Sequence, residues 1–402
     1  MYNDEPLWIQ TWDYHWAYGE HQNHNTNRLF RTPCNGKSPR RSTDIWTIKN
    51  HNRAMTHNQT LEEDIKTFVN SFALSKELEG KKIVITGATG LLGSCMVRCL
   101  LSLYREKGIQ LHVIAVIRDP QKAVAMFGEE CKEITYYECD FSSSEPFLPS
   151  NSADYLFHFA APTASKDFIE KPVETMNTVY YGMQNVLSYA QKANLTSVVL
   201  ASTLEVYGTV TDDSCPLTED MQGYLNPMSA RSSYPLAKRA AEALCHNYAK
   251  EYGTPVKVAR LAQTFGAGVS KKDNRVFAQF ARSVINNEDI ILHTTGDLCR
   301  CYCYTMDAIT AMLYVLLRGK DGEAYNVANE KTYISIRDMA EFVVKNFNLE
   351  RTRVVIQPQE GLGYSPTTKL RLSAERIIQL GWEPYYGLKE MFNRLITSMK
   401  EE

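Results

Sequence analysis

The sequence lacks any long apolar run. No stretch approaches the roughly 18 consecutive apolar residues that mark a membrane-spanning helix, and the first residues lack the apolar core of a secretory signal. It also lacks a charge imbalance, because 44 Lys and Arg stand against 46 Asp and Glu with no long block of either sign. These absences predict a cytoplasmic protein that binds neither a membrane nor nucleic acid.

Cys-x-x-Cys pairs are absent as well. Ten cysteines among 402 residues do not make a disulfide framework. Cys299, Cys301 and Cys303 alternate, which fits one face of a strand better than a zinc site, because zinc ligands are usually separated by two residues. We predict reduced cysteines and no bound metal.

The chain is long enough for more than one domain, since a single core usually stops growing at roughly 250–300 residues. Residues 1–54 differ from the rest: they hold four of the five Trp and four of the nine His, with no sustained period. Such clusters can bind metals or partners, but we predict a disordered extension. Helical patterning begins just after Met55, at "LEEDIKTFVNSF", and we take Met55 as the hypothetical start of the protein.

A glycine-rich turn joins a strand to a helix in "KKIVITGATGLLGSCMVRCLLSLY". The strand covers residues 83–85 and the helix begins near Leu91. Gly87, Gly90 and Gly93 between them would let backbone N–H groups approach a pyrophosphate at the helix N-terminus. The GxxGxxG spacing differs from the commoner GxGxxG, so the turn alone also fits a tight turn without a ligand.

Further strands follow this turn. "LHVIAVIRDP" lies where an acidic residue would bind the adenosine ribose, but Arg118 comes first and Asp119 second. "ITYYECDF" is a third strand that ends at Asp140, and "ADYLFHFAA" is a fourth that ends near His158. Because helical stretches such as residues 173–193 separate the strands, we predict an α/β fold with a parallel, doubly wound sheet.

The stretch "ASTLEVYG" follows an apolar run at residues 197–200. On an extended strand end Thr203 and Glu205 would point the same way, with Leu204 between them. A hydroxyl and a carboxylate there are suited to acid/base chemistry. The apolar Leu204 leaves the type of reaction open.

A tyrosine and a lysine lie one turn apart in "RSSYPLAKRAAEALCHNYAKEYG". Tyr234 and Lys238 share a helix face, and Ser232 or Ser233 would cap a helix that Pro235 helps to start. The ammonium would lower the pKa of the tyrosine towards that of a working general base. Such a pair also arises by chance on helices, so its neighbours in the sequence decide its meaning.

With the glycine turn and Thr203, this pair resembles the short-chain dehydrogenase/reductase family, in its extended branch of nucleotide-sugar epimerases, dehydratases and decarboxylases. The resemblance covers about residues 80–400 through TGATGLLG, CDF, FHFAA, STLEVYG and YPLAK. It implies a Rossmann-type NAD(P)-binding domain over residues 55–265. Residues 266–402 would form mainly a smaller substrate-binding lobe, with some segments returning to the Rossmann sheet.

The resemblance implies a role for each matching residue. Tyr234 would remove a sugar hydroxyl proton, and Lys238 would hold the nicotinamide ribose and tune that tyrosine. Thr203 would hydrogen-bond the reacting oxygen, and Glu205 would face the sugar. The implied cofactor contacts are Gly87, Gly90, Leu91, Leu92, Gly93, Arg118, Asp119, Asp140, Phe141, Ala160 and Ala161, together with Tyr234 and Lys238.

The resemblance also implies substrate contacts. Arg300 in "GDLCRCYCYTMDA" would clasp the diphosphate of a nucleotide sugar, unless it is a solvated surface arginine, and Arg275 is a second candidate for an anion contact. Gln263 stands where the family commonly has an asparagine beside the substrate. Asn177 matches a family asparagine on a central helix, although a buried structural amide is an equally fair interpretation. The family further implies a homodimer.

The residue between Thr203 and Glu205, here Leu204, bears on which reaction of the family this chain would catalyse. The family's 4,6-dehydratases often have Asp-Glu after the threonine, whereas GDP-mannose dehydratases and UDP-glucuronate decarboxylases resemble Thr-x-Glu. Decarboxylation needs the least assistance, because oxidation at C4 creates a β-keto acid. We therefore expect a nucleotide-sugar enzyme that oxidises C4 transiently with NAD, or with NADP, and favour UDP-glucuronate decarboxylase. The alternatives are a 4-epimerase, a 4,6-dehydratase, an NADPH-dependent ketone reductase or a non-catalytic dinucleotide-binding scaffold.

Deletion of residues 1–54 tests the expectation for the N-terminal extension. If the extension is dispensable, the shortened chain should unfold at the same temperature as the full chain, because no part of the core is removed. Thermal unfolding followed by circular dichroism measures this. A loss of folding or of activity would contradict the expectation.

Overall fold

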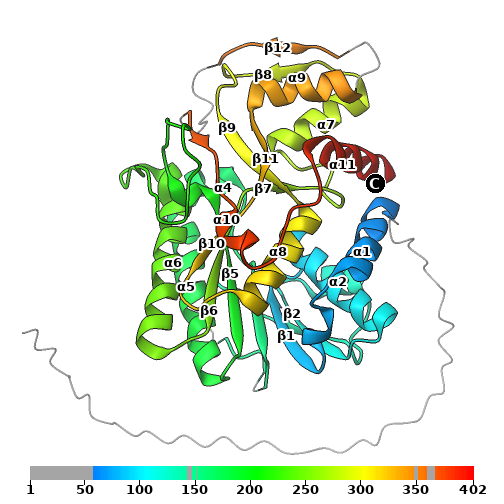
Figure 1. Ribbon diagram of the computed structural model, residues 1–402, viewed down its shortest axis with the longest axis vertical. Coiled ribbons are helices and arrows are strands. Elements are labelled where there is room, and N and C mark those ends of the chain that lie inside the picture. Colours follow the sequence, from blue (N-terminus) through cyan, green and yellow to red (C-terminus); the bar gives the residue numbers. More distant parts are fainter. Residues whose placement is uncertain (1–57, 143–146, 151, 348–351, 360–366) are drawn as a thin grey trace, which may run out of the picture. The chain divides into compact units, whose positions relative to one another are not determined.

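The computed structural model describes residues 58–142, 147–150, 152–347, 352–359 and 367–402 (Figure 1). The expectations for residues 1–54 and for Met55 lie outside these residues. Within the described ranges no helix is long and apolar enough to cross a membrane. No group of three or more His, Cys, Asp or Glu in the same ranges is arranged to hold a metal ion.

A parallel sheet of seven strands forms the larger part of the fold, in the order β10-β6-β5-β4-β1-β2-β3. The strands are β1 (Lys81–Thr86), β2 (Leu111–Ile117), β3 (Ile134–Glu138), β4 (Tyr155–His158), β5 (Ser197–Thr203), β6 (Val256–Leu261) and β10 (Ala324–Val327). The strand order reverses between β1 and β4, which is where open α/β sheets bind ligands. The predicted doubly wound α/β fold is confirmed.

Helices cover both faces of this sheet, and two separate apolar clusters fill the spaces beneath them. Helices α2 (Leu91–Lys107), α3 (Pro120–Phe127) and α8 (Thr305–Arg318) pack on one face, while α5 (Pro172–Lys192) and α6 (Ser233–Tyr252) pack on the other (Figure 1). The strands are therefore nearly continuous apolar runs, as in "KKIVIT" and "LHVIAVI".

A smaller part of the fold is built mostly from the C-terminal third. One sheet has the order β11-β9-β13, with β7 also paired to β9, and a second pairs β12 with β8. The strands are β7 (Gln263–Phe265), β8 (Ile290–Leu292), β9 (Cys299–Tyr304), β11 (Asn329–Ser335), β12 (Val354–Ile356) and β13 (Lys369–Leu370). The helices are α7 (Val276–Asn286), α9 (Ile336–Phe347) and α11 (Leu388–Glu401). The short helix α10 (Glu375–Ile378) instead packs against β10 and α8 of the larger part. The predicted alternation of Cys299, Cys301 and Cys303 along a strand is confirmed in β9.

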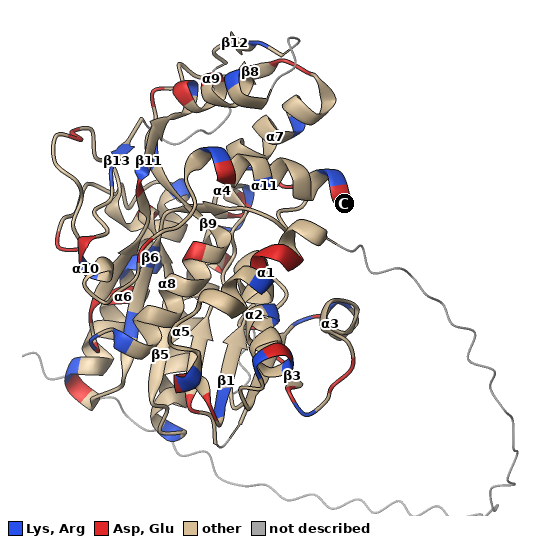
Figure 2. Cartoon of the chain, turned by 45° about the vertical axis from the view of Figure 1, so that its right-hand side comes forward, with Lys and Arg blue, Asp and Glu red and all other residues tan. Residues whose placement is uncertain are grey.

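Two helices far apart in the sequence meet beside the larger sheet. Helix α1 (Gln59–Ser71) precedes β1 and packs against α2 and α11. Asn58 caps α1 by accepting from the amide of Leu61 at 2.9 Å, and its Nδ2 donates to Ser398 Oγ on α11 at 2.7 Å. The buried Asp64 of α1 pairs with Arg394 of α11, with 2.6 Å between Oδ1 and Nε. Basic and acidic residues are interspersed over the fold (Figure 2).

Candidate functional site

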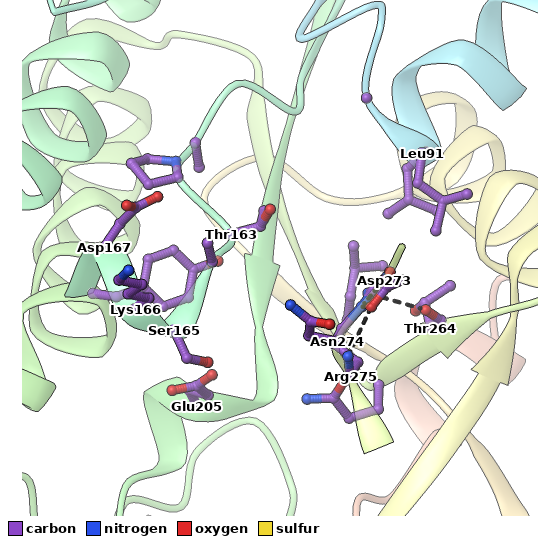
Figure 3. A pocket seen from close by; sticks show the side chains of 18 of the residues that line it. Leu91, Thr163, Ser165, Lys166, Asp167, Glu205, Thr264, Asp273, Asn274 and Arg275 are labelled. Atoms are coloured by element: carbon purple, nitrogen blue, oxygen red, sulfur yellow. Dashed lines mark hydrogen bonds and ion pairs between the residues drawn. The ribbon is translucent and has the colours of Figure 1, made fainter. Parts of the chain in front are cut away.

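A cavity of about 1230 Å³ lies at the carboxyl ends of the parallel strands and extends to the smaller sheets. Its lining includes the segment after β4, from Ala160 to Asp167, and residues 272–276 before and at the start of α7. Figure 3 shows Thr163, Ser165, Lys166 and Asp167 on one side and Asp273, Asn274 and Arg275 on the other. Ligand pockets usually measure about 300–1,000 Å³, so this cavity has space for a cofactor and a substrate together.

The glycine turn after β1 forms a narrow cradle at the cavity. Gly87 has a φ of +63°, and a Cβ there would lie 2.9 Å from the backbone nitrogen of Ala160. A Cβ on Gly93 would lie 2.2 Å from the carbonyl oxygen of Gly87. Gly90 is the N-cap of α2 and offers no side chain to the first-turn N–H groups. The cradle therefore fits the pyrophosphate of a dinucleotide cofactor, which needs close backbone approach at a helix N-terminus.

The strand ends beside the cradle carry the residues predicted to meet the adenosine. Arg118 lines the cavity, but Asp119 does not, because its carboxylate caps α3 by accepting from the Lys122 amide at 3.0 Å. Asp140 lines the cavity two residues beyond the end of β3, and not within the strand as expected. Its carboxylate accepts from the amide of Ser142, which holds the pKa of Asp140 below its ordinary value.

Most of the predicted site residues meet in this one cavity. The predicted residues that line it are Gly87, Gly90, Leu91, Leu92, Gly93, Arg118, Asp140, Phe141, Ala160, Ala161, Glu205, Tyr234, Lys238, Gln263, Arg275 and Arg300. Asp119 and Thr203 are not part of the lining. Asn177 is exposed on α5 and lies outside the lining, so its interpretation as a buried structural amide is wrong.

The strand that carries Thr203 ends there, so the expected extended course through Glu205 is wrong. Residues 204–207 form a 3₁₀ turn, η2 (Leu204–Tyr207), and Thr203 Oγ1 accepts from the amide of Glu205 at 3.2 Å. The turn places Glu205 at the cavity and buries Leu204 in the apolar core. Leu204 is therefore a packing residue and adds no group to the site.

Tyr234 and Lys238 lie at the cavity on α6, as expected from their spacing. Ser232 is the N-cap, but no side-chain hydrogen bond caps the helix, contrary to expectation. The ring of Tyr234 stacks on Phe168 with 4.4 Å between centroids. Lys238 Nζ donates to the carbonyl oxygen of Ala201 at 2.7 Å.

The expected effect of Lys238 on Tyr234 is wrong in this structure. Burial raises the pKa of Tyr234, and the Glu205 carboxylate raises it further, whereas Arg231 lowers it. Burial lowers the pKa of Lys238 to about 8, against a smaller opposing effect of Glu242. A phenol and an ammonium are thus both held where charge is disfavoured.

The sequence did not predict two ion pairs that lie at the cavity. Arg231 Nη2 lies 2.9 Å from Glu205 Oε2, and the guanidinium sits over the Phe168 ring at 5.3 Å. On the opposite side Asp273 holds Arg275, with 2.6 Å between Oδ2 and Nη2. Arg231 precedes Tyr234 by only three residues, but its partner Glu205 comes from the distant turn η2, which no local sequence pattern reveals.

The parallel sheet, the glycine cradle and the Tyr–Lys pair at one cavity define a dinucleotide-dependent α/β enzyme. Residues 83–328 match the model of the NAD dependent epimerase/dehydratase family, and the chain belongs to that family.

Relatives agree with this assignment. The chain is similar to UDP-glucuronic acid decarboxylase 1 of Danio rerio, at 26% identity over 81% of this chain and 74% of that protein. It is also similar to UDP-N-acetyl-alpha-D-glucosaminuronate decarboxylase of Bacillus cytotoxicus, at 29% identity over 80% and 91%.

Solved structures share the fold. The UDP-glucose 4-epimerase of Thermotoga maritima with UDP-glucose has a TM-score of 0.65 at 21% identity, over 80% of this chain and 99% of that one. The dTDP-glucose 4,6-dehydratase DesIV of Streptomyces venezuelae with NAD has a TM-score of 0.64 at 20% identity, over 80% and 97%.

Replacement of Lys238 by Met should stabilise the protein near neutral pH. Below pH 8 the buried ammonium opposes folding, whereas between about pH 8 and 10.5 the unfolded state binds more protons and the stability of the parent rises with pH. We expect the variant to gain on the order of 1–3 kcal/mol in free energy of unfolding at pH 7, and the gain to shrink towards pH 10. Denaturant unfolding at both pH values measures this.

Lys257 provides the matched control. It is equally buried, but its Nζ lies 2.6 Å from Asp321 Oδ1 and donates to Ser197 Oγ at 2.9 Å. Lys257→Met should therefore lower stability at both pH values, because it removes the ion pair with Asp321 and the hydrogen bond to Ser197. An unchanged or lower stability of Lys238→Met at pH 7 would show that the Lys238 ammonium is not disfavoured.

Proposed function

We propose that this chain is a nucleotide-sugar enzyme that oxidises C4 of the sugar transiently, and that it decarboxylates UDP-glucuronate. The observation that carries the proposal is the meeting of Tyr234, Lys238 and Glu205 with the glycine cradle in one cavity. Leu204 is buried, so the Thr-x-Glu motif offers the cavity a single carboxylate. Loss of carbon dioxide from a β-keto acid needs no second acid/base pair, and relatives named as decarboxylases support this choice.

The chain's own residues would handle the protons. Tyr234 accepts the proton of the C4 hydroxyl when C4 is oxidised, and returns it when the C4 ketone is reduced again. NAD, when bound, supplies the hydride acceptor for this cycle. Tyr234 must be a phenolate to accept this proton and becomes a phenol on accepting it, and the positive charge of Arg231 favours that phenolate. Lys238 holds the nicotinamide ribose. Thr203, at the adjoining strand end, hydrogen-bonds the reacting oxygen after a local side-chain adjustment.

Substrate binding would involve both sides of the cavity. Arg300 clasps the diphosphate, and Gln263 lies beside the sugar. Arg275 is a weaker candidate for an anion contact than its charge suggests, because Asp273 already neutralises it. Arg231 donates to Glu205 with one of its N–H groups, and its remaining donors are suited to the carboxylate of a uronic acid.

We propose NAD as the cofactor. The family is NAD dependent, and enzymes that recycle their cofactor in place more often resemble NAD users. Arg118 at the cavity and the outward use of Asp119 as a helix cap would also admit a 2′-phosphate. The nucleotide released on heating the purified protein decides between them, and recovery of NADP would overturn the proposal.

The division of labour and the assembly belong to the same proposal. Residues 55–265 would bind the cofactor and residues 266–402 mainly the substrate, with β10 completing the cofactor-binding sheet.

Val173 and Tyr181 on α5 are 69% and 54% exposed, so this helix offers an apolar surface to a second copy of the chain. Sedimentation of the full chain tests the homodimer, and a monomer would contradict it.

The mass of the product tests the reaction. UDP-glucuronate incubated with the enzyme and NAD should give a product lighter by carbon dioxide, with no net consumption of cofactor. An unchanged mass with an altered sugar would show a 4-epimerase, and loss of water from a hexose nucleotide would show a dehydratase. Stoichiometric NADPH oxidation would show a ketone reductase, and cofactor binding without any turnover would show a scaffold.

Replacement of Tyr234 by Phe tests the role of its hydroxyl. The variant should lose about 10²–10⁴ in turnover, because it keeps the ring against Phe168 but removes the proton acceptor. Cofactor binding, measured by calorimetry, should be almost unchanged. Turnover within a few-fold of the parent would remove Tyr234 from the mechanism.

A further inference from the structure

Strand β9 carries two buried polar atoms that have no hydrogen-bond partner among the described residues. They are Arg300 Nε and the hydroxyl of Tyr302, and both residues line the cavity. Residues two apart on a strand share a face, so the guanidinium and the phenol lie on the same wall. Nearly all buried polar atoms in folded proteins are paired, which makes two adjacent exceptions at a cavity informative.

The position of Tyr302 is fixed by its surroundings. The residue has no exposed surface, and its ring meets Phe265 edge to face with 5.8 Å between centroids. On the neighbouring strand β7 it lies in register with Gln263, which also lines the cavity. The hydroxyl is thus held at the end of a packed ring.

Tyr304, the next residue on the same face, shows the contrasting case. Its hydroxyl donates to the Asp64 carboxylate of helix α1, and Tyr304 does not line the cavity. Two tyrosines of one strand face therefore differ both in position and in bonding: the hydroxyl of Tyr304 is used within the protein, whereas that of Tyr302, at the cavity, is not. Packing alone would be served as well by phenylalanine at position 302.

A guanidinium N–H and a phenol O–H on one wall are two donors that need an acceptor. An anionic oxygen satisfies both, and charge-assisted hydrogen bonds of this kind are the strong ones. The other guanidinium of this part of the cavity, Arg275, is neutralised by Asp273. The unpaired donors of Arg300 and Tyr302 therefore mark the preferred place for a phosphate group.

We propose that the Tyr302 hydroxyl donates a hydrogen bond to the same diphosphate that Arg300 binds, and so selects nucleoside diphosphates. This inference rests on the proposed function and adds a residue to it. The hydroxyl is buried on a residue that lines the cavity, so the contact forms with a small side-chain adjustment on binding. Tyr302 would contribute to affinity and take no part in proton transfer.

Calorimetric titration of the full chain with UDP and with uridine tests the proposal. Tyr302→Phe should bind UDP about 10-fold more weakly than the parent, because a hydrogen bond to a charged group is lost. Its affinity for uridine and for NAD should be unchanged. Uridine has no diphosphate, and the pyrophosphate of NAD binds at the glycine turn and not at Arg300 and Tyr302. Its melting temperature should be equal or higher, because no partner within the protein is lost.

Tyr304→Phe is the matched control. It should melt at a lower temperature, since it removes the hydrogen bond from Tyr304 to the buried Asp64, and it should bind UDP within two-fold of the parent. Equal UDP affinity in the parent and Tyr302→Phe would overturn the inference and leave the proposed function standing. A loss for uridine as large as that for UDP would also overturn it, because it would show a general structural role. Failure of the parent to bind UDP would overturn both proposals.

Discussion

The approach of Gly93 to the carbonyl of Gly87 is the contact on which the rest of the site depends. A single added carbon on Gly93 would lie 2.2 Å from that oxygen, so only glycine lets α2 start this close to the end of β1. The helix N-terminus thereby faces the point where the strand order reverses. The loops after β2, β4 and β5 converge on the same point, and their side chains share one cavity as a result.

Burial sets the chemistry of that cavity. Tyr234 and Lys238 both lie where a low dielectric opposes their charged forms. The pair of Arg231 and Glu205 beside them supplies one charge of each sign. The site is therefore poised by short-range electrostatics, and small shifts of Glu205 or of a bound anion would change the proton affinity of Tyr234.

The sequence predicted what local chemistry determines. Glycines at fixed spacing, apolar strands and the i, i+4 spacing of Tyr234 and Lys238 fixed the sheet, the cradle and the helix face. It could not predict whether a polar side chain at the end of an element bonds a ligand or a nearby backbone amide. Thr203 and Asp119 both offered side-chain oxygens to a ligand, and both bond the amide of a following residue instead. Short polar side chains at element ends compete in this way with any more distant role.

The clasp between α1 and α11 has a consequence for how the chain is made. Asn58 and Ser398 are 340 positions apart, and Thr60 likewise pairs with Glu401. During synthesis the first helix therefore emerges long before the helix that completes its surroundings. The buried Asp64 can accept from Tyr304 earlier, but it meets Arg394 only when nearly the whole chain has left the ribosome. Closure of the fold is thus a late, long-range event, even though the nucleotide cradle is assembled from neighbouring segments.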